Sequence, residues 1–163
     1  MSARAAWRLV SMGFTQVFRY TAGKADWSAS GLPTEGKSVD SRRAGNLARA
    51  DIETCGLTER ADAVRQRLRA KAASICAVVN EQRVLLGHVR AEQVEPNTNY
   101  VVEEIMTAGP TTIRPNTPLE TVIKFFEAHK TDTVWVTTSD GEAMGLLSRE
   151  DVERAKRNAD GGA

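Results

Sequence analysis

The sequence contains few of the residues that build metal sites or disulfide frameworks. It has 163 residues but only two cysteines, Cys55 and Cys76, and two histidines, His88 and His129. Two cysteines form neither a set of bridges nor a four-ligand zinc site, and neither histidine stands at a metal-ligand spacing from them. A disulfide-stabilised secreted domain and a zinc domain are therefore both excluded, and a reducing cytoplasm is the expected location.

Neither sign of charge predominates, and long apolar runs are missing. Lys and Arg number 22 against 21 Asp and Glu, which gives a formal net charge of +1. Nucleic acids and anionic membranes attract an excess of basic residues, so neither partner is expected. The longest apolar run, ICAVV at 75–79, is far shorter than the roughly 20 residues that cross a bilayer, and the first residues lack a signal-peptide core. We expect a soluble protein.

What the sequence does contain is an internal repeat with a period of about 58 residues. When the sequence is aligned with itself at an offset of 58 residues, no gap is needed, and the matching residues are mostly apolar or glycine. They pair Val64 with Val122, Val78 with Val136, Gly87 with Gly145, Val89 with Leu147, and Val94 with Val152. A content of 41% hydrophobic residues is enough for two such units to bury a core.

Each copy predicts the same order of elements, β-α-β-β-α. The first copy has an extended piece at 51–55, a helix at 59–72, strands at 75–80 and 83–89, and a closing helix. In the second copy these are 111–115, 118–130, 133–138 and 142–148, with Asp140-Gly141 as a hairpin turn signal. A three-stranded sheet is too small to stand alone, so we expect an α+β fold in which the two sheets pack together about a pseudo-twofold axis.

These segments resemble the cystathionine β-synthase (CBS) domain pair, the Bateman module. The resemblance is carried by VEEIMTAGPTTIRPNTPLETV at 102–122 and TSDGEAMGLLSREDVERA at 138–155, and it covers roughly residues 47–157. The first copy is recognised mainly through the repeat. The expected domains are a first repeat at 47–95 and a second at 96–163. Trp135 departs from the family pattern, which often has proline there.

Ser148 and Asp151 stand where the last strand of the second copy meets its closing helix. They can cap that helix, with each side chain accepting the backbone N–H of the other residue, which is worth about 1 kcal/mol. A carboxylate at this junction can also accept both hydroxyls of a ribose. The residues alone leave both interpretations open. The resemblance brings the second level with the first, because in CBS pairs the aspartate of Ser/Thr-x-x-Asp commonly binds the ribose of an adenosine ligand.

The resemblance also implies what surrounds such a ligand and what it is. The base is expected in the cleft between the repeats, and AMP, ADP, ATP and S-adenosylmethionine are the candidate ligands. Arg90 and Gln93 replace Ser148 and Asp151 in the pseudo-equivalent cleft, which is therefore expected to be degenerate. Besides Ser148 and Asp151, the expected site contains Leu146, Glu53, Thr54, Ala73, Ser74 and Ile75, with Arg149 as a weaker candidate for phosphate.

Residues 1–36 resemble the last third of a rhodanese domain. The resemblance is carried by Gly-Phe-x-x-Val at 13–17, then a glycine, Trp27 and Gly-Leu-Pro at 31–33. It implies an αβα order with a helix that begins at Ser2, a strand at 15–20 and a short helix, and residues 37–46 then form a polar linker. No cysteine precedes that helix, so no persulfide-carrying nucleophile can be assigned. Either the natural product starts further upstream or the segment is a relic.

The sequence as a whole predicts a non-catalytic regulatory or sensor module that binds an adenosine-containing ligand at one cleft. Two alternatives stand beside it. One is a truncated rhodanese-type sulfurtransferase with a regulatory CBS pair, and the other is a ligand-free dimerisation module. A homodimer is expected because the apolar stripe of Val122, Phe125 and Phe126 exceeds what one small sheet can cover.

Overall fold

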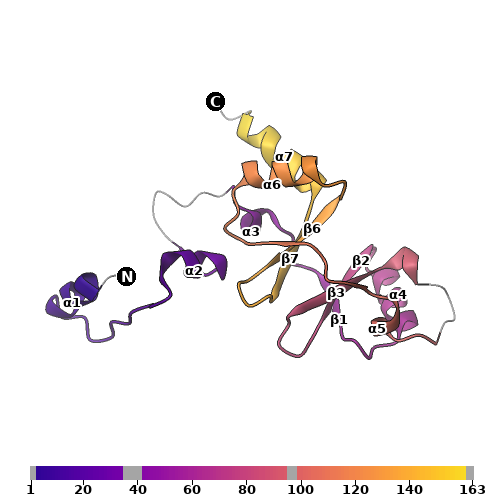
Figure 1. Ribbon diagram of the computed structural model, residues 1–163, viewed down its shortest axis with the longest axis horizontal. Coiled ribbons are helices and arrows are strands. Elements are labelled where there is room, and N and C mark those ends of the chain that lie inside the picture. Colours follow the sequence, from indigo (N-terminus) through magenta and orange to yellow (C-terminus); the bar gives the residue numbers. More distant parts are fainter. Residues whose placement is uncertain (1–2, 35–41, 95–98, 161–163) are drawn as a thin grey trace.

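The computed structural model describes residues 3–34, 42–94 and 99–160 of the chain (Figure 1). Part of the predicted linker and the predicted boundary between the repeats lie outside these residues. The same holds for the last two residues of the rhodanese-like segment, 35–36, and for the C-terminal residues 161–163.

The fold is a mixture of helices and two small sheets, as the sequence predicts. The first sheet has the order β1 (Glu53–Cys55), β2 (Ile75–Val79), β3 (Leu85–Arg90) and β4 (Thr107–Ala108). The second has the order β5 (Thr112–Ile113), β6 (Thr133–Thr137) and β7 (Ala143–Ser148). The helices between and after these strands are α4 (Ala61–Ala70), the 3-10 turn η1 (Ala91–Gln93), the short α5 (Val102–Ile105), α6 (Leu119–Ala128) and α7 (Arg149–Asp160).

Two details differ from the predicted order. The first sheet has a fourth strand, because β4 pairs antiparallel with β3. The counterpart of β4 in the second sheet is a single bridge between Arg49 and Leu146. The closing helix of the first repeat is only the short turn η1, whereas α7 closes the second repeat with 12 residues.

The strand register follows the repeat. Thr54 faces Ala77 in the first sheet and Thr112 faces Trp135 in the second, which is the same pair displaced by one repeat. The antiparallel hairpins β2-β3 and β6-β7 also agree, and each contains a register irregularity at the equivalent position. The two copies are therefore structurally equivalent residue by residue along their strands.

The tips of the two hairpins contact each other at a local pseudo-twofold axis. Val84 and Glu142 occupy equivalent positions in the two copies and form an antiparallel bridge with each other. Two backbone hydrogen bonds of 2.9 and 3.0 Å flank this bridge, and they too are related by the repeat. The predicted pseudo-twofold arrangement therefore has a direct backbone contact at its centre.

Each repeat begins with a one-turn helix that packs into the core of the other repeat. Ala44 of α3 (Ala44–Leu47) is fully buried in the core of the second repeat, with Leu119 and Val122. Val102 of α5 (Val102–Ile105) is fully buried in the first, with Val64. In Figure 1, α3 has the purple of the early chain but lies below α6. The predicted linker at 37–46 therefore extends too far, because residues 44–46 belong to α3.

The same exchange explains why both copies contain a glycine in the third strand of the repeat. The chain that follows α3 passes so close to Gly145 that an added Cβ would lie 2.7 Å from the carbonyl oxygen of Arg49. The chain that follows α5 approaches Gly87 in the same way, with 2.8 Å to the carbonyl oxygen of Thr107. Only a residue without a side chain leaves room for this approach.

A third apolar cluster fills the space between the two sheets. Ile75, Ala77 and Trp135 form its buried part, and Ile52 and Leu146 pack against them. Trp135, the departure from the expected family pattern, is only 3% exposed. Its large side chain faces the other sheet across the pseudo-twofold axis, where the equivalent residue is the small Ala77.

The apolar stripe that suggested a homodimer belongs to the core of the single chain. Val122 is fully buried, Phe126 is 2% exposed, and both pack with Leu147 beneath α6. Phe125 packs at the edge of the same cluster and stacks on His129. This stripe therefore gives no support to a dimer.

The N-terminal segment forms its two expected helices but not its expected strand. α1 (Ala3–Ser11) stops before Gly13, whose φ of +92° ends the helix, and α2 (Gly23–Ala29) follows. Residues 15–20, all of which the structure describes, form no strand, and Phe18 is 82% exposed. A strand suited to a parallel sheet has no neighbour here. In Figure 1, α1 lies away from both sheets, whereas Ser30, after α2, contacts Ser139 at 3.0 Å.

Replacing Gly145 with alanine is expected to lower the free energy of unfolding by about 1–3 kcal/mol, because the new Cβ pushes against the Arg49 carbonyl. Gly56→Ala is the matched control, since no atom lies within 4 Å of its added Cβ. Its stability should stay the same or rise by up to about 1 kcal/mol. Urea unfolding measures both, and equal effects would contradict the close approach.

Candidate functional site

A cavity of about 230 Å³ lies between the two repeats, at the end of the inter-sheet cluster. It has less room than the roughly 300–1,000 Å³ of pockets that enclose a drug-sized ligand, so it can hold a ring system while the rest of a larger ligand lies outside. Five of the nine predicted site residues line it. They are Glu53, Ala73, Ser74 and Ile75 from the first repeat and Leu146 from β7.

Six further residues line the cavity that the sequence did not single out as site residues. Two of them are cations, Arg49 and Lys71, and the side chain of each is 60% exposed. The others are Asp51, Ile52, Ala72 and Trp135. The cavity wall is therefore mixed, with apolar and small side chains and Trp135 beside two acidic and two basic groups.

Ser148 and Asp151 form the expected cap at the start of α7. Asp151 Oδ2 accepts hydrogen bonds from the Ser148 hydroxyl at 2.5 Å and from the Ser148 backbone N–H at 3.3 Å. The backbone N–H of Asp151 in turn donates to Ser148 Oγ at 3.2 Å. The carboxylate is thus held in one orientation, and only 8% of the Asp151 side chain is exposed.

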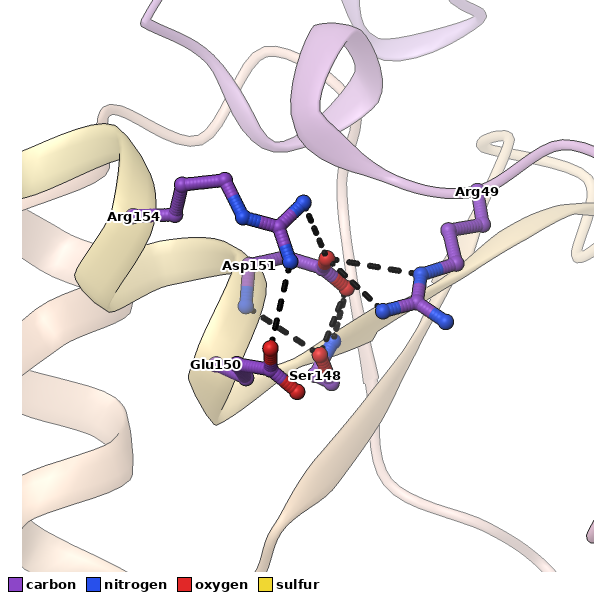
Figure 2. A network of polar contacts seen from close by, with 5 residues as sticks. All are labelled: Arg49, Ser148, Glu150, Asp151 and Arg154. Carbon is purple, nitrogen blue, oxygen red and sulfur yellow. Dashed lines mark hydrogen bonds and ion pairs between the residues drawn. The ribbon is translucent and has the colours of Figure 1, made fainter. Parts of the chain in front are cut away.

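The other carboxylate oxygen of Asp151 faces two guanidinium groups (Figure 2). Arg49 donates to Oδ1 from Nη2 at 2.9 Å and from Nε at 3.3 Å. Arg154, which also pairs with Glu150 on the same helix, lies 3.6 Å from Oδ1. Arg49 also lines the cavity, so this one side chain connects the cavity to the carboxylate.

Arg49 reaches Asp151 because its backbone is fixed on β7. Its N–H donates to the carbonyl of Leu146 at 2.9 Å, and its carbonyl accepts from the N–H of Leu146 at 3.0 Å. Although Arg49 precedes the first strand of the first repeat, it is thereby placed beside the helix start of the second repeat. The exchange of α3 between the repeats is what carries it there.

The electrostatics of this contact keep Asp151 ionised. Burial of the carboxyl would raise the pKa of Asp151, but hydrogen bonds from Arg49 and Ser148 outweigh it and lower that pKa below its ordinary value. The same hydrogen bond and the charge of Asp151 raise the pKa of Arg49. Both groups therefore carry full charge near neutral pH.

Glu53, which lines the cavity from β1, is also paired. Lys71 Nζ lies 2.7 Å from one carboxylate oxygen, and Arg67 Nε lies 3.6 Å from the other. The Glu53 side chain is 12% exposed, whereas that of Lys71 is 60% exposed. Glu53 and Asp151 thus each have an exposed cation that lines the cavity as a partner.

Four of the nine predicted site residues do not line the cavity. Ser148 and Asp151 are connected to it through Arg49, whereas Arg149 and Thr54 lie elsewhere. The Arg149 guanidinium donates to the carbonyls of Phe126 at 2.6 Å and Thr131 at 3.0 Å, and it covers the Phe126 ring. Arg149 therefore connects the end of α6 to the start of α7 through hydrogen bonds. Thr54 does not line the cavity, and its carbonyl accepts a hydrogen bond from Arg67.

At the pseudo-equivalent position of the first repeat, Gln93 takes the place of Asp151. Its Oε1 accepts the backbone N–H of Arg90 at 3.0 Å, so it forms half of the same cap without a charge. Arg90 has no hydroxyl to complete the cap in the way that Ser148 does. Capping is therefore common to both repeats, whereas the paired carboxylate is found only in the second.

Two other kinds of site find no support in the described part of the chain. Its His, Cys, Asp and Glu residues form no group of three or more that could hold a metal ion. None of its helices combines the length and the apolar character that a membrane span requires.

The comparisons with known proteins agree with this fold. The model of the CBS domain family matches residues 102–158, which is the second repeat. No curated protein gives a significant match to the sequence. Among solved structures, the CBS-pair protein CBSX2 from Arabidopsis thaliana has a TM-score of 0.65 at 21% identity, over 74% of this chain and 98% of its own.

Three further structures of this fold were solved with adenosine compounds. CBSX2 in complex with AMP has a TM-score of 0.64 at 21% identity, over 72% of this chain and 98% of its own. The cytosolic domain of the Mg²⁺ channel MgtE, in complex with ATP, has 0.63 at 22% identity, over 71% and 49%. The CBS pair of protein MJ0100, with 5′-methylthioadenosine and S-adenosyl-L-methionine, has 0.61 at 17%, over 72% and 97%. At these identities the likeness shows the fold.

Asp151→Asn is expected to lower the free energy of unfolding by about 1–2 kcal/mol at pH 7, because it removes the charge that Arg49 and Ser148 stabilise. A carboxyl whose pKa is lowered by folding stabilises the folded state fully at pH values above its unfolded pKa, which is about 3.9. This stability is lost as the pH falls through the lower pKa of the folded state. The difference between wild type and variant should therefore be constant above about pH 5 and should shrink below about pH 4.

Asp132→Asn is the control, since that side chain is 92% exposed and lies 3.8 Å from Arg149. Its effect should stay within about 0.5 kcal/mol at every pH. Denaturant unfolding between pH 3 and pH 8 measures both variants. A loss for Asp151→Asn that grew toward acid pH would contradict the assigned charge.

Proposed function

We propose that the chain is a non-catalytic regulatory or sensor module that binds one adenosine-containing ligand in the cavity between its repeats. The observation that carries this proposal is the position of Asp151. A buried, oriented and ionised carboxylate lies at the start of a helix, and Arg49 links it to a cavity whose wall combines apolar and charged side chains. Such a carboxylate suits the two hydroxyls of a ribose, and the cavity suits a flat ring.

In the proposed complex the base lies in the cavity. Ile75 and Leu146 contact its faces, Trp135 closes the inner end, and Ser74 and Glu53 offer polar groups to its edge. Asp151 accepts the ribose hydroxyls, and Ser148 keeps the carboxylate oriented. Small side chains at Ala72 and Ala73 leave the space that the ring needs.

The ligands bound in structures of this fold support an adenosine compound. AMP, ATP, 5′-methylthioadenosine and S-adenosyl-L-methionine are all present in them. AMP, ADP, ATP and S-adenosylmethionine are therefore the candidates for this chain. Binding of a small ligand between two repeats suits a regulatory role.

The remaining parts of the proposal rest on the sequence. A cytoplasmic location follows from the two cysteines, both of which are free and buried. The homodimer is proposed from the resemblance to CBS pairs alone. Residues 1–36 are proposed to be a rhodanese-like remnant, and nothing in the described structure favours the sulfurtransferase alternative.

Calorimetry with AMP is the test of this function. We expect one site per chain, and Asp151→Asn should weaken binding about tenfold or more, because a charge-assisted contact to the ribose is lost. Gln93→Ala, at the equivalent position of the first repeat, should leave affinity within about twofold. Two sites per chain, or equal losses from both variants, would contradict the assignment.

A separate screen by thermal shift decides between a sensor and a ligand-free dimerisation module. AMP, ADP, ATP and S-adenosylmethionine at about 100 times their dissociation constants should each stabilise a binding protein by about 2.7 kcal/mol. No shift with any of the four at millimolar concentration would favour the ligand-free module.

A further inference from the structure

Every acceptor position that Asp151 offers is already in use. Ser148 occupies Oδ2 with its hydroxyl and its N–H, and Arg49 occupies Oδ1 with two N–H groups. A ribose can bind this carboxylate only if it displaces a donor. The Ser148 contacts are built into the helix cap, so Arg49 is the group that must leave.

Arg49 is able to leave without unfolding its surroundings. Its side chain is 60% exposed, and its backbone is held on β7 by two hydrogen bonds that do not involve the guanidinium. Arg154 lies 3.6 Å from Asp151 on the same helix, so the carboxylate has a second cation nearby that does not depend on Arg49. The guanidinium can therefore rotate while the protein backbone stays in place.

The outcome of this displacement depends on the charge of the ligand. The hydroxyls of a neutral nucleoside replace the hydrogen bonds of Arg49 on Asp151, but they leave Arg49 without an anion in return. A ligand with a phosphate supplies that anion, and guanidinium and phosphate form strong paired hydrogen bonds. A cationic ligand would leave two positive groups side by side.

The other charges of the cavity strengthen this dependence. Asp51 and Glu53 both line it, and both repel a phosphate. Lys71 is already bonded to Glu53 at 2.7 Å. Among the residues that line the cavity, Arg49 is thus the cation that ligand binding itself releases.

We propose that Arg49 makes this cavity selective for adenosine nucleotides, which carry a phosphate, over neutral or cationic adenosine compounds. This inference rests on the proposed function and names its ligand class. Arg49 covers Asp151 when the cavity is empty of nucleotide, and it moves to the phosphate when the ribose takes the carboxylate. It is a specificity-determining residue and not a catalytic one.

The test compares AMP with adenosine on the full chain by calorimetry. Wild type should bind AMP about tenfold or more tightly than adenosine, which is the worth of one charge-assisted contact. Its AMP affinity should fall with added salt, whereas its adenosine affinity should change little. In Arg49→Gln the two affinities should lie within about threefold, because AMP loses its cation and adenosine no longer competes with a charged side chain.

Arg154→Gln is the matched control. It also removes a guanidinium beside Asp151, with a similar exposed fraction of 55%, but Arg154 is not among the residues that line the cavity. Its preference for AMP should therefore remain about tenfold. Circular dichroism and thermal unfolding establish that both variants fold, and the salt dependence of wild type gives a readout that needs no variant.

The possible outcomes distinguish a failure of the proposed selectivity from a failure of the proposed adenosine-binding function. If neither AMP nor adenosine binds wild type, the proposed function fails and the inference with it. If wild type binds both within threefold, the adenosine site stands but the selectivity is wrong. If Arg49→Gln still prefers AMP, or if Arg154→Gln loses the preference to the same extent, Arg49 is not the residue that binds the phosphate.

Discussion

The exchange of the one-turn helices α3 and α5 is the constraint on which the rest of this structure depends. Neither small sheet has enough surface to form a core alone, and each is completed by apolar residues from the other repeat, such as Ala44 and Val102. The exchange also brings the chain close to Gly87 and Gly145, where a side chain does not fit. Because Arg49 comes two residues after α3, the same exchange places it on β7 beside Asp151.

The candidate site lies at positions where the residues of the two repeats differ. Backbone register, hairpin contact and helix exchange are shared by both copies, so differences between the clefts come from side chains and from the closing element, which is η1 in the first repeat and the longer α7 in the second. Ser148 and Asp151 stand against Arg90 and Gln93, Trp135 stands against Ala77, and Arg49 stands against Thr107. These substitutions place a carboxylate, a large aromatic side chain and an exposed cation at one cleft. A symmetric scaffold thereby carries an asymmetric site.

Much of this fold follows from the sequence, because the repeat and the periodicity of apolar residues are local signals. The strands other than β4, together with α4, α6 and the cap of Ser148 with Asp151, are predicted within a few residues. The helix exchange is not, because Ala44 and Leu47 stand in a short polar-looking stretch with no period to reveal them. The strand at 15–20 is wrongly predicted, since sequence shows its propensity but not its missing neighbours. Arg49 was missed for the same reason as α3: only the tertiary path brings it to Asp151.

A crystal structure of the chain grown with AMP tests the central claim most directly. The account predicts one AMP per chain in the cavity lined by Ile75, Trp135 and Leu146, with both ribose hydroxyls on Asp151 and the Arg49 guanidinium on the phosphate. The Ser148 hydrogen bonds to Asp151 should be unchanged. AMP bound beside Arg90 and Gln93, or bound while Arg49 still contacts Asp151, would contradict it.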